Sequence, residues 1–172
     1  GKDIPDSFTF DLVSPYQYDN KEIHISRKDA NQLAKEISCD IVYIDPPYNS
    51  RQYSRFYHVL ENITTWRKPK LYGEARKPEA ENMSEYCRNS ATTVFEDLIT
   101  SLNCKYIVVS YNNTYNSKSS SSKNKITLED IKRILEKKGS VKVFEKSHQF
   151  FYSFKTSLDD HKELIFIAKV GE

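Results

Sequence analysis

Apolar and polar positions recur with two different periods along the chain, and together these periods predict an α/β fold. Two β-prone stretches, 41–44 and 105–110, contain continuous apolar runs that are typical of strands buried on both faces. Apolar residues between 30 and 37 recur at the helical spacing i, i+3, i+4 and i+7. Since 22–26 alternates like a short strand, the order strand, helix, strand predicts a βαβ unit with parallel strands.

Helical patterns account for three later stretches. We expect helices from about 56 to 66, over 84–101, and directly after Thr127. Thr127 is a good N-cap residue, and Asp130 three positions later resembles the acidic partner of a capping box. Gly139 is expected to end this last helix, because glycine readily adopts the backbone conformation that closes a helix.

Two strands and two long loops complete the pattern. One strand is predicted over 141–144 and another over 163–168, and we expect the pair to form an antiparallel hairpin at the sheet edge. The charged stretch 67–83 and the serine-rich stretch 114–125 are predicted to be loops. Residues 1–20 show no clear period, so we expect an irregular leading segment before the folded part.

An acid, two prolines and an aromatic residue follow the strand 41–44 directly: Asp45, Pro46, Pro47 and Tyr48. The prolines end the strand, because they cannot donate a ladder hydrogen bond. Asp45 and Tyr48 are therefore presented at the carboxyl end of a central strand. In open α/β sheets this is where ligands bind, so the four residues are the first candidates for a functional site.

The formal net charge of the 172 residues is only +2, but the charge is unevenly distributed. Residues 1–45 carry five Lys or Arg and nine Asp or Glu, whereas 46–90 carry eight and five, and 111–146 carry nine and four. The basic charge that gathers after residue 45 suits a polyanionic partner on one face. Solvated lysines on helix surfaces are the alternative explanation.

The cysteines and histidines show no metal-ligand spacing, and we expect no metal site. Three widely spaced cysteines without a CxxC pair are typical of reduced thiols, which favours an intracellular, cytoplasmic protein. No apolar run approaches the roughly 20 residues that a membrane-spanning helix needs.

The sequence DPPY at 45–48 resembles the catalytic motif of the amino-group DNA methyltransferases, which methylate adenine N6 or cytosine N4 with S-adenosylmethionine. The longer sequence DPPYNSRQY at 45–53 is similar to that of N6-adenine enzymes related to Dam. The resemblance extends from about 23 to 168. It implies a partial Rossmann-like methyltransferase sheet with helices on both faces and a C-terminal antiparallel edge hairpin, and it makes 21–172 the catalytic part.

The resemblance also implies a bacterial restriction-modification enzyme that acts on adenine in double-stranded DNA. Two other functions stay open, because a bare DPPY also occurs in base-methylating RNA enzymes. One is an RNA methyltransferase of that kind. The other is a catalytically silent module that binds nucleic acid and has kept the fold.

The chemistry of the motif suits transfer to an amine. An exocyclic amine on an aromatic base is a poor nucleophile, because its lone pair is delocalised into the ring. The Asp45 carboxylate and the Pro46 carbonyl can accept hydrogen bonds from the two N–H groups of this amine. These bonds free the lone pair to attack an electron-poor methyl group held nearby. Tyr48 can stack on the base, which has to leave the duplex to be held in this way. Pro47 completes the catalytic motif.

Asp29, Ala30 and Asp45 are the candidate cofactor-binding residues. By resemblance, Asp29 lies where these enzymes hold the adenine of the cofactor, and its carboxylate can accept from the adenine amino group. Asp29 is also a plausible N-cap for the helix that begins at Ala30, and one residue can serve both purposes.

Polar, basic and aromatic residues near the motif are candidate contacts to the DNA strand and its phosphates. They are Asn49, Arg51, Gln52, Tyr53, Arg55, Lys118 and Lys123. An exposed polar loop is the alternative explanation for all of them. Asn112 and Asn113, after the second central strand, either line the pocket or serve a turn.

The family also has a glycine-rich loop, where the backbone approaches the methionine part of the cofactor. This chain has no counterpart, because its four glycines are far apart in the sequence. The region that recognises the target sequence is missing too. We therefore expect a missing N-terminal half or second subunit to carry both, and little cofactor binding or activity from this chain alone.

Overall fold

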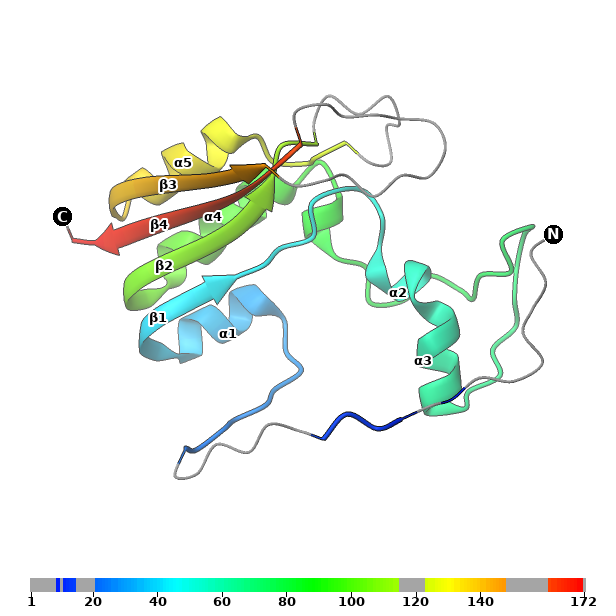
Figure 1. The fold of residues 1–172 in the computed structure, drawn as a ribbon. Coiled ribbons are helices and arrows are strands. Elements are labelled where there is room, and N and C mark those ends of the chain that lie inside the picture. Colours follow the sequence, from blue (N-terminus) through cyan, green and yellow to red (C-terminus); the bar gives the residue numbers. More distant parts are fainter. Residues whose placement is uncertain (1–8, 10, 15–20, 115–122, 148–160, 172) are drawn as a thin grey trace.

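A computed structural model describes residues 9, 11–14, 21–114, 123–147 and 161–171 (Figure 1). The helices are α1 (Ala30–Glu36), α2 (Tyr53–Phe56), α3 (His58–Thr65), the 3₁₀ helix η1 (Glu85–Cys87), α4 (Ala91–Ser101) and α5 (Leu128–Glu136). The strands are β1 (Ser38–Ile44), β2 (Asn103–Asn112), β3 (Gly139–Ser147) and β4 (Lys162–Val170). The predicted leading segment 1–20 lies mostly outside the described residues.

The described strands form one sheet in the order β1-β2-β4-β3, which confirms the predicted α/β class. β1 and β2 are parallel, and Ile44 pairs with Val109 at their carboxyl ends. β4 runs antiparallel to both β2 and β3. The predicted antiparallel pairing of the last two strands is therefore confirmed, with β3 at the edge and β4 inside the sheet.

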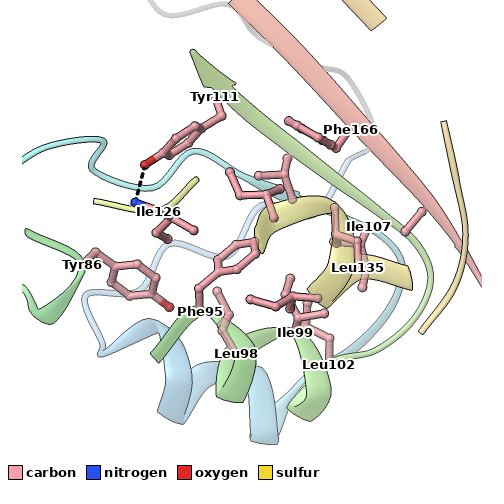
Figure 2. Packing of buried hydrophobic residues seen from close by; sticks show 14 of the residues in the cluster. Tyr86, Phe95, Leu98, Ile99, Leu102, Ile107, Tyr111, Ile126, Leu135 and Phe166 are labelled. Carbon is pink, nitrogen blue, oxygen red and sulfur yellow. Dashed lines mark hydrogen bonds between the residues drawn. The ribbon is translucent and has the colours of Figure 1, made fainter. Parts of the chain in front are cut away.

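The core lies between one face of this sheet and the helices α1, α4 and α5 (Figure 2). Alternate residues of the central strands point into it, as the pleat requires, and Ile107, Val109 and Phe166 are almost fully buried. The helices contribute Ala34, Phe95, Leu98, Ile99, Ile131, Ile134 and Leu135. This packing holds β1 and β2 side by side, so that their carboxyl ends meet at one edge of the sheet.

The opposite face of the sheet differs from the expected pattern of helices on both faces. On that face Ile41 and Tyr43 of β1 are 61% and 62% exposed, and Phe144 of β3 is 56% exposed. Among the described residues, the helices that join the core all lie on the other side. The sequence pattern missed this because an apolar side chain looks the same whether a neighbouring helix covers it or not.

The predicted strand at 22–26 is wrong. Residues 21–29 form no strand, and Ile23 and Ile25 are largely exposed. A strand needs a partner to satisfy its backbone groups, and alternation in the sequence does not supply one. The parallel pair is instead β1 with β2, and the crossover between them contains α4.

The start of α5 follows the prediction, whereas the role of Gly139 does not. Thr127 accepts a 3.0 Å hydrogen bond from the Asp130 backbone N–H, which is the first bond of a capping box. The Asp130 carboxylate then accepts from the Thr127 hydroxyl, whereas in a full capping box it accepts from the backbone N–H of the cap residue. α5 already ends at Glu136, and Gly139 begins β3. A Cβ at Gly139 would lie 1.9 Å from the Lys169 carbonyl oxygen, so glycine is required there by the close approach of β4.

Candidate active site

The structure places Asp45 at the end of β1, directly beside the end of β2. The Ser110 hydroxyl donates a 2.8 Å hydrogen bond to Oδ1 of Asp45, and the Tyr48 hydroxyl donates a second of 2.9 Å to the same oxygen. Asp45 is exposed. Within the described part of the chain, no group donates to Oδ2 of Asp45. The carboxylate is thus oriented through one oxygen, and the other oxygen is left without a donor from the described residues.

The turn 45–48 is held in place by the segment that leads into α5. The Tyr48 carbonyl accepts from the Lys125 backbone N–H at 2.8 Å and from the Tyr111 hydroxyl at 3.2 Å. The Tyr111 hydroxyl in turn accepts from the backbone N–H of Ile126 at 3.3 Å, the dashed line in Figure 2. The rings of Tyr48 and Tyr111 meet edge to face, with centroids 5.1 Å apart. These contacts make the turn rigid.

The environment of Tyr48 keeps its hydroxyl protonated. Burial of the ring and the bond to the Asp45 carboxylate both raise the pKa of Tyr48 well above the ordinary 10.0. Tyr48 therefore stays a neutral donor that orients Asp45. Pro46 between them is buried, and within the described chain its carbonyl accepts no hydrogen bond, so that oxygen is a second acceptor beside Oδ2 of Asp45.

A cavity of about 1170 Å³ is lined by the predicted cofactor-binding residues and by all the predicted catalytic residues except Tyr48. Asp29 and Ala30 at the start of α1 line it, together with Asp45, Pro46 and Pro47. Sequence spacing alone does not place 29 and 45 on one cavity, and here the fold does so by packing α1 beside β1.

Asp29 acts as the N-cap of α1, as one of its two predicted roles requires. Its Oδ1 accepts from the backbone N–H groups of Asn31 and Gln32 at 3.0 and 3.1 Å. The side chain is exposed and borders the cavity, so the cap leaves Asp29 at the place where its second predicted role requires it.

Comparison with known proteins identifies the family. The sequence model of the D12 class N6 adenine-specific DNA methyltransferases matches residues 11–125, which include the whole site. The chain belongs to this methyltransferase family. No solved structure matches it.

Several modification methylases are similar to this chain. The modification methylase StsI of Streptococcus sanguinis is 42% identical over 99 residues, which are 56% of this chain and 15% of that protein. The type II methyltransferase M.NlaIII of Neisseria lactamica is 34% identical over 139 residues, or 80% of this chain and 39% of the relative. The type II methyltransferase M2.HphI of Haemophilus parahaemolyticus is 31% identical over 157 residues, which are 88% of this chain and 41% of that protein. The chain thus spans well under half the length of these relatives.

Three residues of the methyltransferase site escaped the sequence analysis. Ser110 and Tyr111 hold the motif, and Asn31 joins α1 to α4 by donating to the Val94 carbonyl at 2.9 Å and to the Asp97 carboxylate at 2.7 Å. Ser110 could have been found, because it ends the predicted strand 105–110, just as Asp45 directly follows the predicted strand 41–44. Its position therefore matches that of Asp45, one residue after Ile44.

Gln52, a predicted DNA contact, has another role in this methyltransferase. It is only 8% exposed, and its amide donates to the Ser84 carbonyl at 2.9 Å while accepting from the Ser84 N–H at 2.7 Å. Both ends of the amide are used, so the side chain is not available to DNA. Gln52 instead fastens the segment after the motif to the start of η1.

The other predicted nucleic-acid contacts of the methyltransferase differ in how exposed their side chains are. Arg51 and Tyr53 are exposed, Arg55 is half-buried, and Asn49 accepts from the Arg51 backbone N–H. Lys123 is exposed, and Lys118 lies outside the described residues. Their contact with DNA stays a prediction.

Of the two asparagines at the end of β2 in this methyltransferase, Asn112 serves a local turn and Asn113 joins the end of β2 to the start of β4. Asn112 is buried and accepts from the Thr114 backbone N–H, whereas Asn113 accepts a 2.8 Å hydrogen bond from the Lys162 N–H.

Within the described ranges, no three His, Cys, Asp or Glu side chains gather as a metal site would require. None of the described helices is long and apolar enough to cross a membrane.

Proposed function

We propose that this chain provides the amine-activating part of a restriction-modification enzyme that methylates N6 of adenine in double-stranded DNA with S-adenosylmethionine. The observation that carries the proposal is the arrangement at Asp45. Ser110 and Tyr48 hold its Oδ1, while Oδ2 and the Pro46 carbonyl both remain as acceptors. Two acceptors that bind no donor within the described chain suit an amine that has two N–H groups.

The chain's own residues then act by orientation. Oδ2 of Asp45 and the carbonyl of Pro46 each accept one N–H of the flipped adenine amine, which draws the nitrogen toward tetrahedral geometry and frees its lone pair. The bound cofactor supplies a methyl group made electron-poor by a positive sulfur. When the nitrogen has gained the methyl group, Oδ2 of Asp45 takes the proton that it loses. Positioning is the main source of rate in such a site.

The residues around the cavity suit the adenosyl part of the cofactor. The Asp29 carboxylate can accept a hydrogen bond from the adenine amino group, and the Asp45 carboxylate can attract the cationic sulfur. Leu33 and Ile44 offer apolar contact. The methionine part fits less well, because none of the described glycines lines this cavity. This mismatch supports the expectation that a glycine-rich loop comes from outside these residues.

The free edge of the sheet supports the same expectation. In the described sheet β1 pairs with β2 only, so its other edge carries unpaired backbone groups. Ile41 and Tyr43 of the same strand are exposed. We propose that the missing half or second subunit packs here, where it also reaches the cavity beside Asp45.

Substitution of Asp45 tests the function. In the intact methyltransferase, Asp45→Asn keeps the size of the side chain but replaces one acceptor oxygen by an amide. We expect it to lower formation of N6-methyladenine in DNA by about 100-fold or more. Asp40→Asn is the matched control, because Asp40 lies on the strand that Asp45 follows and, among the described residues, its exposed carboxylate pairs only with Lys105. A wild-type rate in the Asp45 variant would refute the proposal.

Calorimetry tests the need for a second part. We expect no tight binding of S-adenosylmethionine to this chain alone, and binding once the region with the glycine-rich loop is added. Tight binding to the chain by itself would show that the cavity is already complete.

A further inference from the structure

The segment 51–77, which follows the motif, is rich in basic residues that have no role in the proposed mechanism. Residues 51–77 carry seven Lys or Arg and two Glu, in a chain whose total net charge is only +2. The segment contains α2, α3 and an irregular stretch closed by a bridge between Tyr72 and Lys77. It projects from the sheet and its helices (Figure 1). A local excess of five positive charges favours a polyanion.

The same segment exposes aromatic side chains. Five aromatic residues here are at least half exposed: Tyr53, Phe56, Tyr57, Trp66 and Tyr72. Trp66 is the most exposed, at 70%, and Lys68 lies 4.7 Å from the centre of its ring. Lys70 lies 5.5 Å from the ring of Tyr72. Cations beside exposed aromatic faces are the combination that proteins use to hold single-stranded nucleic acid.

A groove of about 530 Å³ is lined by Trp66, Lys68 and Arg76, whereas Lys70 and Tyr72 belong to the same stretch, 68–76, without lining it. One wall is the apolar side of α3, with Val59 and Ile63, and the other is the stretch 68–76. Trp66, at the C-terminus of α3, has a φ of 52°, which an aromatic residue rarely adopts. The backbone at this point therefore holds the ring of Trp66 at the border of the groove in a conformation that costs free energy.

We propose that this groove binds an unpaired stretch of the DNA strand beside the target base. Lys68, Lys70 and Arg76 meet its phosphates, while Trp66 and Tyr72 stack on its bases. The choice of DNA as the partner rests on the proposed function. A protein partner fits less well, because lysine is depleted at the centres of protein interfaces and here it lies against both aromatic rings.

Trp66 gives a direct test, because it is the only tryptophan in the chain. The chain is titrated at low salt with a short single-stranded oligonucleotide of mixed sequence. We expect saturable quenching of tryptophan fluorescence, and an affinity that falls as salt rises. No quenching by an oligonucleotide that binds, as measured by its anisotropy, would overturn the proposal.

Charge removal locates the binding site. The triple variant Lys68→Ala, Lys70→Ala and Arg76→Ala should bind at least tenfold more weakly, and its salt dependence should be shallower by about 2 in the slope of log K against log salt. The matched control removes the same charge from exposed positions elsewhere: Lys105→Ala, Lys132→Ala and Lys142→Ala. It should bind nearly as the wild type does. An equal loss in both triple variants would refute a specific groove.

The stacking part is tested by Trp66→Ala, which should weaken single-strand binding about tenfold while leaving binding of a fully paired duplex nearly unchanged. If sedimentation shows instead that the groove variants abolish self-association and leave DNA binding intact, a second copy is the partner and the proposal is wrong. None of these measurements needs methyl transfer. Unaltered DNA binding in the groove variants would therefore reject this inference alone, whereas wild-type methylation by Asp45→Asn would reject the proposed function alone.

Discussion

The Ser110 hydroxyl donates a 2.8 Å hydrogen bond to Oδ1 of Asp45 across the ends of two neighbouring parallel strands, although 65 positions separate the two residues in the sequence. The bond uses the oxygen that Tyr48 also contacts, and within the described chain no group donates to the other oxygen of Asp45. Under the proposed function Ser110 is therefore a positioning residue, because it acts through Asp45.

Loss of the Ser110 hydroxyl should slow catalysis more than it weakens binding. We expect Ser110→Ala to lower kcat for DNA methylation roughly tenfold, since a hydrogen bond to a charged group contributes about 1.5 kcal/mol or more. The KM for DNA should change little. Steady-state methyl transfer by the intact enzyme measures both constants. Ser147→Ala, at the exposed end of β3, is the control, and a change in KM alone would contradict the positioning role.

The amide of Gln52 should matter for stability and not for DNA binding. Gln52→Ala leaves the N–H and the carbonyl of Ser84 without partners, which should lower the free energy of unfolding by about 2–3 kcal/mol. Urea denaturation measures this loss. Gln32→Ala on the exposed side of α1 should cost little. If Gln52→Ala instead weakened DNA binding of the folded protein, the predicted DNA contact would be right after all.

Two glycine substitutions should have very different effects. Gly139→Ala places a Cβ 1.9 Å from the Lys169 carbonyl oxygen within a paired strand, and we expect a loss of about 3 kcal/mol or more in unfolding free energy. Gly73 has open space around it but a φ of +65°, so Gly73→Ala should cost only about 1–2 kcal/mol. Thermal and urea unfolding of both variants test the order, and equal losses would contradict the close contact at Gly139.

Two tyrosines should make the fold less stable at high pH. Burial, and then nearby carboxylates, raise the pKa of Tyr48 and of Tyr86 above the ordinary 10.0. At a pH between 10.0 and the raised pKa values, these tyrosines have lost their protons in the unfolded chain but keep them in the folded chain. The free energy of unfolding therefore falls as pH rises above about 10. Below that pH the stabilisation is fully present.

Urea unfolding over this range of pH should show the decline, with a shallower slope in Tyr86→Phe. That variant also loses the hydrogen bond from Tyr86 to Asn31, so its stability at neutral pH should be lower. An identical slope in the variant and the wild type would rule out Tyr86 as a source of the pH dependence.

The sequence by itself determined the parts of this protein that depend on local chemistry. Thr127 and Asp29 cap their helices as predicted, because a cap is made within a few residues of chain. The strand that Asp45 directly follows was evident from its apolar run and the two prolines. The family was recognisable from the same short motif, and the match over 11–125 agrees with it.

Only the tertiary structure decided which distant groups meet. The stretch 22–26 alternates like a strand, yet it has no partner and stays irregular. Gln52 looked like part of an exposed polar loop until the chain brought Ser84 to both ends of its amide. Ser110 became a neighbour of Asp45 through strand pairing. Hydrogen bonds and burial are properties of pairs of residues, and a single sequence specifies the members of such pairs without saying which of them meet.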